Sequence, residues 1–586
     1  MNSEEISFQQ QHEGENNNKD ILIISKPLYI KEDVNSCGYC KGKKEKLGNY
    51  FSLESSTKQH VKIDSNSNNE YTDVQLNNCT LGLHVELTSV EIYDKFCNSG
   101  FRRSGRYLYK PDLLRTCCKL YTIRTTMEQC KLSKDLKTSF KRFKKFTNTT
   151  DYLIDNPDKV EDFNSRYINP DEDMSANTNS KFDLLKEMYS IEKYSPDFET
   201  RFEPCHFSEE KFQLFKKYQT IIHKDEEVNP KMFERFLCLT PFSTDVVNGK
   251  QQEWDYLNSW TKTWEKKFMN QAPNDNENND DKYERNDFLP RLGPAHECYY
   301  FKGKLIAISV LDFLPSGISS VYFIWDPDYP KWALGKVSAL RELALVNLLD
   351  LDYYYMGYYI DDCPKMNYKE KYGGELLDVC NNQYVPLESV KNYIKNGKFF
   401  VLSNVSNKQN ASSDEDDDYD ETEEFYNKVE LPLNDINNLD LTKSVVDISE
   451  QLYGTKTSNS IDYANMIIDR LYKYKIYYPN ILNNDYFFKK QMTTNDENED
   501  DEENTNSIYN MPAIVPGLLP LWQILQMIDR DEIKRLNNKL MIYDTEFKRM
   551  RVVKEFMNEN VYTKRCVINI VRLIGLEMTA KALLVL

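Results

Sequence analysis

The stretch YYFKGKLIAISVLDFLPSGISSVYFIWD, residues 299–326, decides the fold of this chain of 586 residues. It contains two runs of apolar, β-branched and aromatic residues, 305–311 and 318–325, which predict two strands. The sequence Lys302-Gly303-Lys304 before the first run predicts a hairpin turn, because glycine readily adopts the positive φ that such a turn needs. Nearly every residue of both runs is apolar, so we expect both faces of these strands to be buried.

A helix and a third strand follow. In GKVSALRELALVNLL, residues 335–349, the residues Leu340, Leu343 and Leu348 recur at helical spacing, which predicts a helix packed on the sheet. The run DYYYMGYYI, residues 352–360, predicts another strand. The order strand, strand, helix, strand is typical of the core of a GNAT-type acyltransferase, a mixed α/β (α+β) fold.

The segment before this helix argues against coenzyme A as the acyl donor. Enzymes of this fold that use acetyl-CoA carry a glycine-rich loop there, whose backbone N–H groups hold the pyrophosphate. Here the segment reads DPDYPKWALG, residues 326–335, with one glycine and two prolines. Because proline has no N–H to donate, we expect no CoA site and disfavour a CoA-dependent N-acetyltransferase.

The net charge of −18 comes mostly from two short segments. Residues 414–424 contain nine acidic side chains and residues 496–503 contain seven, with no lysine or arginine in either. Such runs repel themselves and stay solvated, so we expect disordered inserts at 406–425 and 492–508, and a third, rich in Asn and Asp, at 271–287. The rest of the chain is close to neutral, so the overall charge does not exclude nucleic acid as a partner.

The chain shows no secretory signal and no membrane span. Its N-terminus is acidic and rich in Asn and Gln, and no apolar run approaches the ~20 residues that a bilayer requires. Residues 566–586 are apolar but contain three charged residues, so we expect a docking helix there. The 13 cysteines should then be reduced thiols or ligands. We expect a cytoplasmic protein, with the nucleus as a second location.

Two cysteine pairs form a candidate metal site. Cys37-Gly38-Tyr39-Cys40 has the spacing of a metal knuckle or a redox pair, and Cys117 and Cys118 follow about eighty residues later. Four thiolates from two segments suit zinc or an iron–sulfur cluster, although adjacent cysteines are a poor fit to a zinc tetrahedron. The alternative is a structural knuckle beside a free cysteine pair.

A basic region lies around the second cysteine pair. Residues 102–145 contain fourteen Lys or Arg and three acidic residues, with aromatic residues between them. Basic side chains bind phosphate and aromatic ones stack on bases, so the region is a candidate for RNA contact. For residues 131–145 a solvated basic helix is the simpler interpretation.

Five motifs together resemble the arginyl-tRNA–protein transferase family of the eukaryotic type. The resemblance covers roughly residues 36–124 and 205–387. The motifs are GFRRSGRYLYKPD (100–112), FLPSGISSVY (313–322), LGKVSALRE (334–342), YMGYYI (355–360) and CPKM (363–366). The chain departs from the family at Lys119, where proline is usual, at Asp361-Asp362, where His-Ser is usual, and at Glu370, where glycine is usual.

The resemblance implies a reaction and its partners. The family transfers arginine from arginyl-tRNA, the co-substrate, to the α-amine of acceptor proteins that begin with Asp, Glu or oxidised Cys, which marks them for ubiquitin-dependent degradation. It also implies that Cys37, Cys40, Cys117 and Cys118 bind an iron–sulfur cluster, with zinc as the alternative, and that the N-terminal region reads the acceptor. We expect a monomer.

Direct attack of an amine on an activated ester needs alignment, a neutral amine and stabilisation of the oxyanion, and no covalent nucleophile. We therefore expect the chemistry where the central strands end. The catalytic candidates are Tyr358, Asp312 and Asp326. The candidates for substrate binding are Arg102, Arg103 and Arg106 for a carboxylate, Lys336 and Arg341 for phosphate, Tyr322 opposite Tyr358, and Lys365 and Tyr368 for the acceptor or the tRNA 3′ end.

Each of these residues also has a structural interpretation. Tyrosines that alternate along a strand are often core residues, and Asp326 before Pro327 can simply open a turn. For the whole chain, the alternative function is a non-catalytic protein that binds tRNA or protein N-termini and retains the fold.

The predicted layout has five parts. They are a disordered tail (1–30), a cysteine-bearing domain for the cluster and the acceptor (31–147), a linker with a helix (148–200), the GNAT-like transferase domain (201–395) and a helical C-terminal region (396–586).

Overall fold

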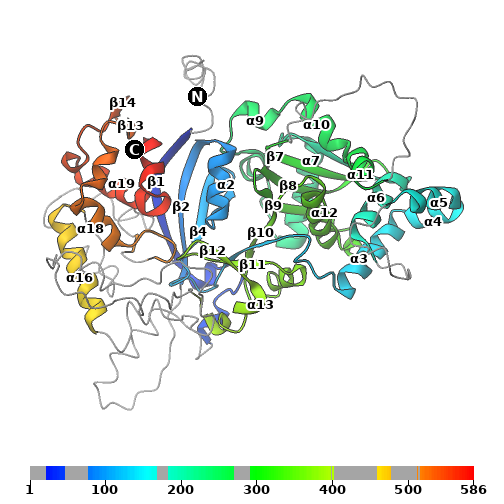
Figure 1. Cartoon of the computed structure of the whole chain (residues 1–586), viewed down its shortest axis with the longest axis horizontal. Helices are drawn as coiled ribbons and strands as arrows, with labels where there is room; N and C mark the ends of the chain where they lie inside the picture. Colours follow the sequence, from blue (N-terminus) through cyan, green and yellow to red (C-terminus); the bar gives the residue numbers. More distant parts are fainter. Residues whose placement is uncertain are drawn as a thin grey trace, which may run out of the picture.

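A computed structural model describes residues 21–46, 77–167, 182–269, 291–397, 399–400, 458–476, 511–512 and 515–586. The three predicted inserts, at 271–287, 406–425 and 492–508, lie outside the described residues, as do residues 1–20 of the predicted tail. The described residues form two mixed β-sheets with helices around them (Figure 1), which confirms the α+β class.

The larger sheet has eight strands in the order β12-β11-β5-β10-β9-β8-β7-β6. All neighbours in it are antiparallel except β9 and β10, which run parallel. Its strands are β5 (Tyr121–Thr125), β6 (Phe198–Glu203), β7 (Gly293–Phe301), β8 (Lys304–Leu314), β9 (Gly317–Trp325), β10 (Tyr353–Tyr359), β11 (Glu375–Asp378) and β12 (Gln383–Pro386).

The quoted stretch folds as predicted. β7 and β8 form a hairpin whose turn places Lys302 at φ 51° and Gly303 at φ 73°. β9 follows, then α12 (Leu334–Leu348), then β10, which confirms the order strand, strand, helix, strand. The core of the predicted fold is therefore present.

Helices cover both faces of this sheet, as the alternation of side chains along β8 shows. Ser309 donates a hydrogen bond to Glu342 of α12 on one face, while Ile308 packs with Phe215 of α7 on the other. A second layer of helices packs on α12, so this helix is buried on nearly every side. The helices of this part are α2 (Val90–Asn98), α3 (Lys134–Phe146), α4 (Thr149–Asp155), α5 (Pro157–Arg166), α6 (Leu184–Tyr194), α7 (Glu209–Tyr218), α8 (Pro230–Phe233), α9 (Thr244–Asn248), α10 (Gln251–Asn258), α11 (Trp260–Phe268) and α13 (Leu387–Val390).

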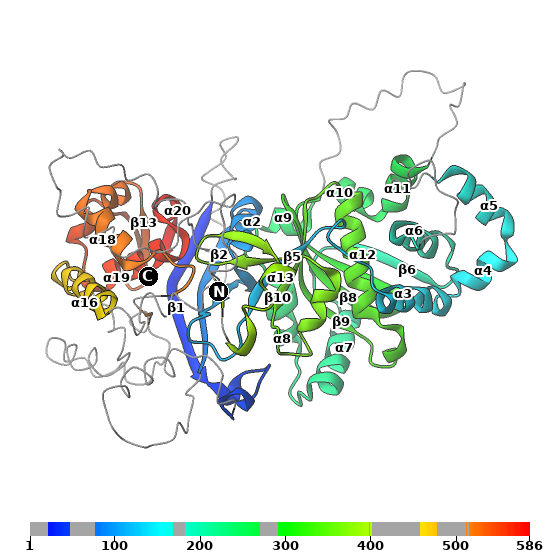
Figure 2. The same cartoon turned by 60° about the horizontal axis from the view of Figure 1, so that its bottom comes forward.

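The smaller sheet joins the two ends of the chain. Its order is β14-β13-β15-β1-β2-β4-β3, and β1 and β15 run parallel beside each other. Figures 1 and 2 show the C-terminus of the chain next to β1. Its strands are β1 (Leu22–Asp33), β2 (Asn77–Thr88), β3 (Arg102–Ser104), β4 (Tyr107–Pro111), β13 (Met541–Asp544), β14 (Arg549–Val552) and β15 (Leu583–Val585). The C-terminal helices beside it are α16 (Ser458–Lys473), α18 (Leu521–Asp529), α19 (Val561–Ile574) and α20 (Leu576–Lys581).

This arrangement differs from the predicted layout in four respects. Strand β1 begins at Leu22, inside the predicted tail, and helices α4, α5 and α6 occupy much of the predicted linker. The C-terminal region is not helical throughout, because β13, β14 and β15 complete the smaller sheet. Strand β5 comes from the cysteine-bearing segment but belongs to the larger sheet.

The docking helix predicted at 566–586 is confirmed only in its first part, by α19, which is buried along most of its length and lies against β1. A short second helix, α20, and strand β15 follow it. Among the helices of the described residues, none combines the length and the apolar character that crossing a bilayer requires.

Candidate active site and four-cysteine centre

The larger sheet opens between its two parallel strands. β9 and β10 pair only over Gly317–Ser319 and Tyr353–Tyr355. Farther along, β9 pairs only with β8, and β10 only with β5. The facing edges of β9 and β10 are therefore unpaired there. The carboxyl ends of parallel strands that part are a recurrent place for ligands, since their backbone groups have lost ladder partners. We take this opening as the candidate active site.

Several side chains lie along the opening. On β9, the Tyr322 hydroxyl lies 3.3 Å from Nε2 of His223, and the Phe236 ring packs edge-on against the Tyr322 ring. On β10, Gly357 adopts φ 72° at a register shift in the pairing with β5. The positive φ favours glycine here, and a Cβ at this position would meet Lys369 Nζ only at an ordinary contact distance of 3.8 Å.

Tyr358 is a buried structural residue. Its hydroxyl donates hydrogen bonds of 3.1 Å to the carbonyls of Gly100 and Tyr109, which ties β10 to the smaller sheet. Burial raises the pKa of Tyr358 well above its ordinary value, so the phenol stays protonated. These contacts favour a positioning role for Tyr358 over the predicted catalytic one.

Asp312 forms a buried ion pair with Arg103. The guanidinium donates through Nε and Nη2 to the two carboxylate oxygens, each at 2.7 Å, and both side chains are almost fully buried. Burial opposes the charge of Arg103, but Asp312 outweighs it and holds the pKa above its ordinary value. Each residue is the other's partner, so neither faces the opening as a base or a substrate ligand.

Asp326 is also engaged by cations. It accepts hydrogen bonds from Lys217 at 2.5 Å and from Lys304 at 2.7 Å, and from the backbone N–H of Asp328. Burial raises its pKa, but the two ammonium donors outweigh this and hold the pKa below the ordinary value. These contacts agree with the alternative interpretation, in which Asp326 opens the turn at Pro327.

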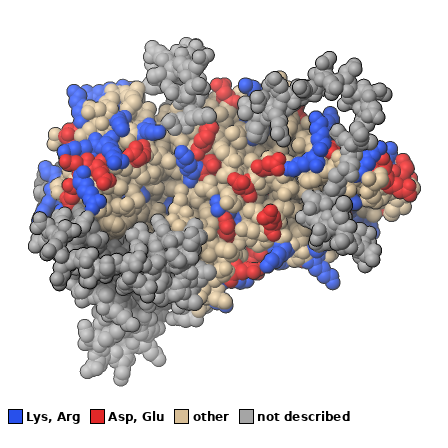
Figure 3. Space-filling view, in the orientation of Figure 1, with Lys and Arg blue, Asp and Glu red and all other residues tan. Residues whose placement is uncertain are grey.

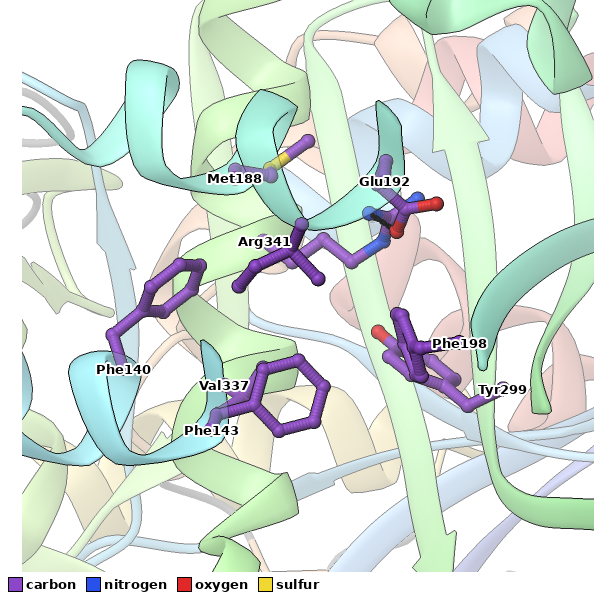
Figure 4. Close-up of a pocket in the computed structure, with 9 residues that line it drawn as sticks. Phe140, Phe143, Met188, Glu192, Phe198, Tyr299, Val337 and Arg341 are labelled. Carbon is purple, nitrogen blue, oxygen red and sulfur yellow. Dashed lines mark hydrogen bonds and ion pairs between the residues drawn. The ribbon is translucent and has the colours of Figure 1, made fainter. Parts of the chain in front are cut away.

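Arg341 is part of the core between α12 and α6, and not a phosphate ligand. Its guanidinium bonds Glu297, Glu192 and the Thr200 hydroxyl and stacks over Trp260. Figure 4 shows this guanidinium beside Glu192, with aromatic rings around a cavity of about 10 Å³. A cavity of that size holds one water at most.

The remaining binding candidates lie at different places. Lys336 pairs with Asp135 of α3 at 2.8 Å, and Arg106 bonds Glu86 at 3.1 Å. Lys365 and Tyr368 are exposed in the segment after β10, Lys365 in a turn and Tyr368 in a 3-10 helix (Asn367–Tyr372). Tyr322 lies on the opening itself, where it was predicted.

Three arginines were predicted to bind a carboxylate: Arg102, Arg103 and Arg106. Among them, Arg102 is buried and has no ion pair with a carboxylate of the described residues. Its Nη1 donates to the carbonyls of Cys97 at 2.8 Å and Phe101 at 2.6 Å. Its Nε and Nη2 have no hydrogen-bond partner among the described residues.

Sequence reasoning missed two residues next to the opening. Lys369 is buried and donates to the Tyr358 carbonyl at 2.6 Å. Glu342 is fully buried and accepts from Ser309, Ser338 and Tyr354. Burial raises the pKa of Glu342 despite these donors. No local pattern in the sequence pointed to Lys369 or to Glu342.

The four predicted cysteines come together at one point. All four Sγ atoms lie within 4.8 Å of one another, with Cys37 and Cys118 at 3.8 Å and Cys40 and Cys117 at 3.6 Å. All four are buried. Contacts among the four thiols lower the pKa of Cys37 and that of Cys40, the latter to about 7, and raise the pKa of Cys117 and of Cys118. Four buried sulfurs this close together can hold a metal.

The cysteine cluster adjoins the opening through the loop after β10. Ile360, Cys363 and Met366 pack against the four cysteines, and Lys44 pairs with Asp362 at 2.7 Å. The loop that follows the candidate active site is therefore one wall of the four-cysteine cluster.

Charge on the surface is mixed. On the face that Figure 3 shows, acidic and basic side chains alternate over the described residues. Helix α3 buries its apolar residues Leu136, Phe140 and Phe143 and exposes lysines on its other face. It therefore fits the solvated basic helix that was the simpler prediction for residues 131–145.

A mixed sheet whose parallel strands part beside a buried helix defines the class: an α+β acyltransferase. Models of the arginine-tRNA-protein transferase family match residues 35–138 (N terminus) and 210–378 (C terminus). The chain is 37% identical over 582 residues to Arginyl-tRNA--protein transferase 1 of Saccharomyces cerevisiae, which covers 96% of this chain and 98% of that protein. The chain belongs to the arginyl-tRNA–protein transferase family.

Shorter similarities reach other relatives. Arginyl-tRNA--protein transferase 2 of Arabidopsis thaliana is 33% identical over 215 residues, 35% of this chain and 30% of that protein. An Aspartate/glutamate leucyltransferase of Campylobacter jejuni is 39% identical over 75 residues, 13% of this chain and 31% of that protein.

Proposed function

We propose that this chain transfers arginine from arginyl-tRNA to the N-terminal α-amine of proteins that begin with Asp, Glu or oxidised Cys. The product carries a new N-terminal arginine, which marks it for ubiquitin-dependent degradation. The observation that carries the proposal is the opening between β9 and β10, in a chain that belongs to this transferase family.

The reaction is direct aminolysis. The acceptor amine attacks the ester carbonyl of arginyl-tRNA, a C–N bond forms, the ester C–O bond breaks, and the tRNA leaves with its 3′-terminal hydroxyl restored. The amine loses a proton in the process. The enzyme gains most by holding both substrates in line and by offering N–H donors to the oxyanion. The parted edges of β9 and β10 suit both tasks, and Tyr322 and Tyr368 are placed to contact either substrate.

We further propose that the four cysteines hold one zinc ion. Four sulfurs at the ~2.3 Å Zn–S distance of a tetrahedral site lie roughly 3.8 Å apart. Two of the Sγ–Sγ distances, 3.6 and 3.8 Å, suit that geometry, and all of them lie within 4.8 Å. Such a zinc would join the loop that carries Cys37 and Cys40 to the segment that carries Cys117 and Cys118. Metal and acid-labile sulfide analysis of anaerobically purified protein tests this; iron and sulfide without zinc would contradict it.

The test of the activity uses two peptides that differ only in N-terminal Asp or Gly, incubated with radiolabelled arginyl-tRNA and anaerobically purified protein. We expect label on the Asp peptide alone. If tRNA binds but neither peptide is labelled, the chain is instead a non-catalytic binding protein. The cytoplasmic location remains a prediction that imaging of the tagged protein checks.

A further inference from the structure

His223 lies where a helix changes its winding beside the candidate active site. Helix α7 ends at Tyr218, and the turn that continues it, Gln219–His223, is a π-helix. This turn closes at Lys224, which adopts φ 68° and donates its backbone N–H to the Gln219 carbonyl. Because π-helical turns are rare and occur frequently at functional sites, the residue at the end of this one is a candidate for a function.

The π-helical turn brings the imidazole of His223 to Tyr322 of β9. Nε2 of His223 lies 3.3 Å from the Tyr322 hydroxyl. The Tyr322 ring packs edge-on against Phe236, which belongs to a second π-helical turn, Glu234–Cys238. The Tyr218 ring packs edge-on against the imidazole, with 5.3 Å between the ring centres. Two turns of this rare kind therefore hold one histidine and one tyrosine together.

The pair lies at the open edge of β9. Tyr322 comes three residues after Ser319, the last residue of β9 that pairs with β10. Burial, and then the nearby Tyr322 and Tyr368 hydroxyls, raises the pKa of Tyr218 to about 12. Tyr368 belongs to the segment after β10, so the group of aromatic side chains draws on both sides of the opening. His223 is exposed, so a substrate in the opening can reach its imidazole.

The bond to Tyr322 leaves one nitrogen of the imidazole open. Nδ1 of His223 has no hydrogen-bond partner among the described residues. With its hydrogen on Nε2, the imidazole donates to the Tyr322 oxygen and keeps the lone pair of Nδ1 free. This is the arrangement of a general base: a neighbour orients one ring nitrogen, and the other is left for the substrate.

We propose that His223 is a catalytic residue of the transfer, the base that accepts the proton of the acceptor's α-amine. The inference rests on the proposed function. As the amine nitrogen bonds to the ester carbonyl carbon, its proton moves to Nδ1 of His223. The ester C–O bond then breaks, and the imidazolium returns the proton to the leaving oxygen of the tRNA. The histidine ends as it began, so the step needs no further reactant.

Tyr322 is the positioning residue in this proposal, because it holds the imidazole through Nε2. It does not compete for the proton. Burial raises the pKa of each of the three phenols around the imidazole, so they stay protonated at neutral pH; they are Tyr218, Tyr322 and Tyr368. The charged residues next to His223 in the chain, Lys224 and Asp225, are both exposed. Histidine is the side chain that ordinarily changes its charge near neutral pH.

A structural alternative exists for His223. A protonated histidine in the last turn of a helix also interacts favourably with the helix dipole. Such a cation would stabilise the fold and would have no part in the transfer of a proton. The two roles therefore differ in what they predict for the pH dependence of the reaction.

The experiment measures arginine transfer to the Asp peptide from about pH 5.5 to 9. The proteins are the full chain, His223→Gln, Tyr322→Phe and the control His206→Gln. His206 is also an exposed histidine, but it precedes α7. Circular dichroism and urea denaturation check each variant. His223→Ala, with and without added imidazole, repeats the test in a second variant, and imidazole without enzyme gives the background rate.

We expect His223→Gln to lower kcat by roughly 100- to 10,000-fold, with little change in KM for either substrate. On the acid side, log kcat/KM should rise with a slope of about two in the full chain and the control, because amine and imidazole must both be neutral, and with a slope of about one in His223→Gln. Tyr322→Phe should keep the slope of the full chain at a rate roughly tenfold lower. Added imidazole should restore part of the rate of His223→Ala.

A folded His223→Gln variant with the kcat or the acid-side slope of the full chain would overturn the proposal. If that variant also unfolds at lower urea, His223 is a helix-terminal cation instead. Either result, in a full chain that transfers arginine, leaves the proposed function standing. A full chain that transfers no arginine at any pH would contradict the proposed function itself, and this inference with it.

Discussion

At the scale of single residues, Tyr358 joins the two sheets through its hydroxyl. Tyr358→Phe removes the donor to the carbonyls of Gly100 and Tyr109. We expect a loss of about 1–3 kcal/mol in the free energy of unfolding, because two buried acceptors lose their partner, and a kcat close to that of the unaltered chain. Urea denaturation and arginine transfer measure the two effects. A folded variant with kcat a hundredfold lower would instead make Tyr358 catalytic.

The pair of Asp312 and Arg103 gives a second prediction at this scale. Asp312→Asn leaves a buried guanidinium without its anion, so we expect a loss of about 3–5 kcal/mol in unfolding free energy. The double variant Asp312→Leu with Arg103→Met should regain most of it, because no charge is left unpaired. A double variant no more stable than Asp312→Asn would refute the explanation.

His296 predicts how stability depends on pH. It is fully buried between Lys211 and the Leu237 carbonyl, and burial, then Lys211, lowers its pKa to about 3. The unfolded chain, with an ordinary value near 6.5, binds a proton first. The stability from neutral His296 is therefore present above pH ~6.5 and is lost as the pH falls toward ~3. Melting temperatures from pH 7.5 to 5 should fall less for His296→Gln than for the unaltered chain; parallel curves would contradict this.

The partners of these residues explain why sequence reasoning misjudged them. Asp312 was predicted at the end of a strand, whereas β8 continues to Leu314 and the partner of Asp312, Arg103, lies 209 residues away in the chain. Likewise Arg341 was predicted to bind phosphate, and Glu192, which pairs with it, lies 149 residues earlier. The four cysteines were predictable, because two short pairs carry the spacing signal themselves.

At the scale of elements, the meeting of β9 and β10 depends on Gly317. A Cβ there would lie 1.9 Å from the Tyr353 carbonyl oxygen, so the two strands could not pair as they do. We expect Gly317→Ala to lower the free energy of unfolding by at least about 3 kcal/mol and to abolish arginine transfer.

Gly335→Ala is the matched control, measured in the same thermal and transfer assays. Its Cβ would meet only a ring carbon of Phe323 at 3.9 Å, within the first turn of α12. Alanine favours a helix over glycine, so stability should rise by up to about 1 kcal/mol. Equal losses in both variants would show that strand contact is not the cause.

The central strands and α12 were predictable because each follows from a local pattern, either a glycine turn or a periodic run of apolar residues. The elements that pack around them were not predictable from such patterns. α12 reads as an amphipathic helix, yet α3 and α6 cover its outer face as well. Strand β5 is five residues long and enters a sheet whose other strands begin some 75 residues later, at Phe198.

At the scale of the whole molecule, β15 holds the smaller sheet together, because it lies between β1 and β13. Leu584 is fully buried in this strand, while Val585 turns to the other face and is partly exposed. We expect Leu584→Ala to cost about 2–5 kcal/mol in unfolding free energy and Val585→Ala less than about 1 kcal/mol. Denaturant titration compares them. Equal costs would mean that β15 does not pack inward as described.

The two ends of β1 depend on different neighbours, which has a consequence for how the strand opens. Ile23–Ser25 pair with β15 as well as lying next to β2, whereas the end of β1 that leads to Cys37 pairs with β2 alone. A change that loosens β15 should therefore expose the start of β1 and leave the segment before the cysteine loop paired. Amide hydrogen exchange in Leu584→Ala should be faster at Ile23–Ser25 and unchanged at Lys31–Asp33.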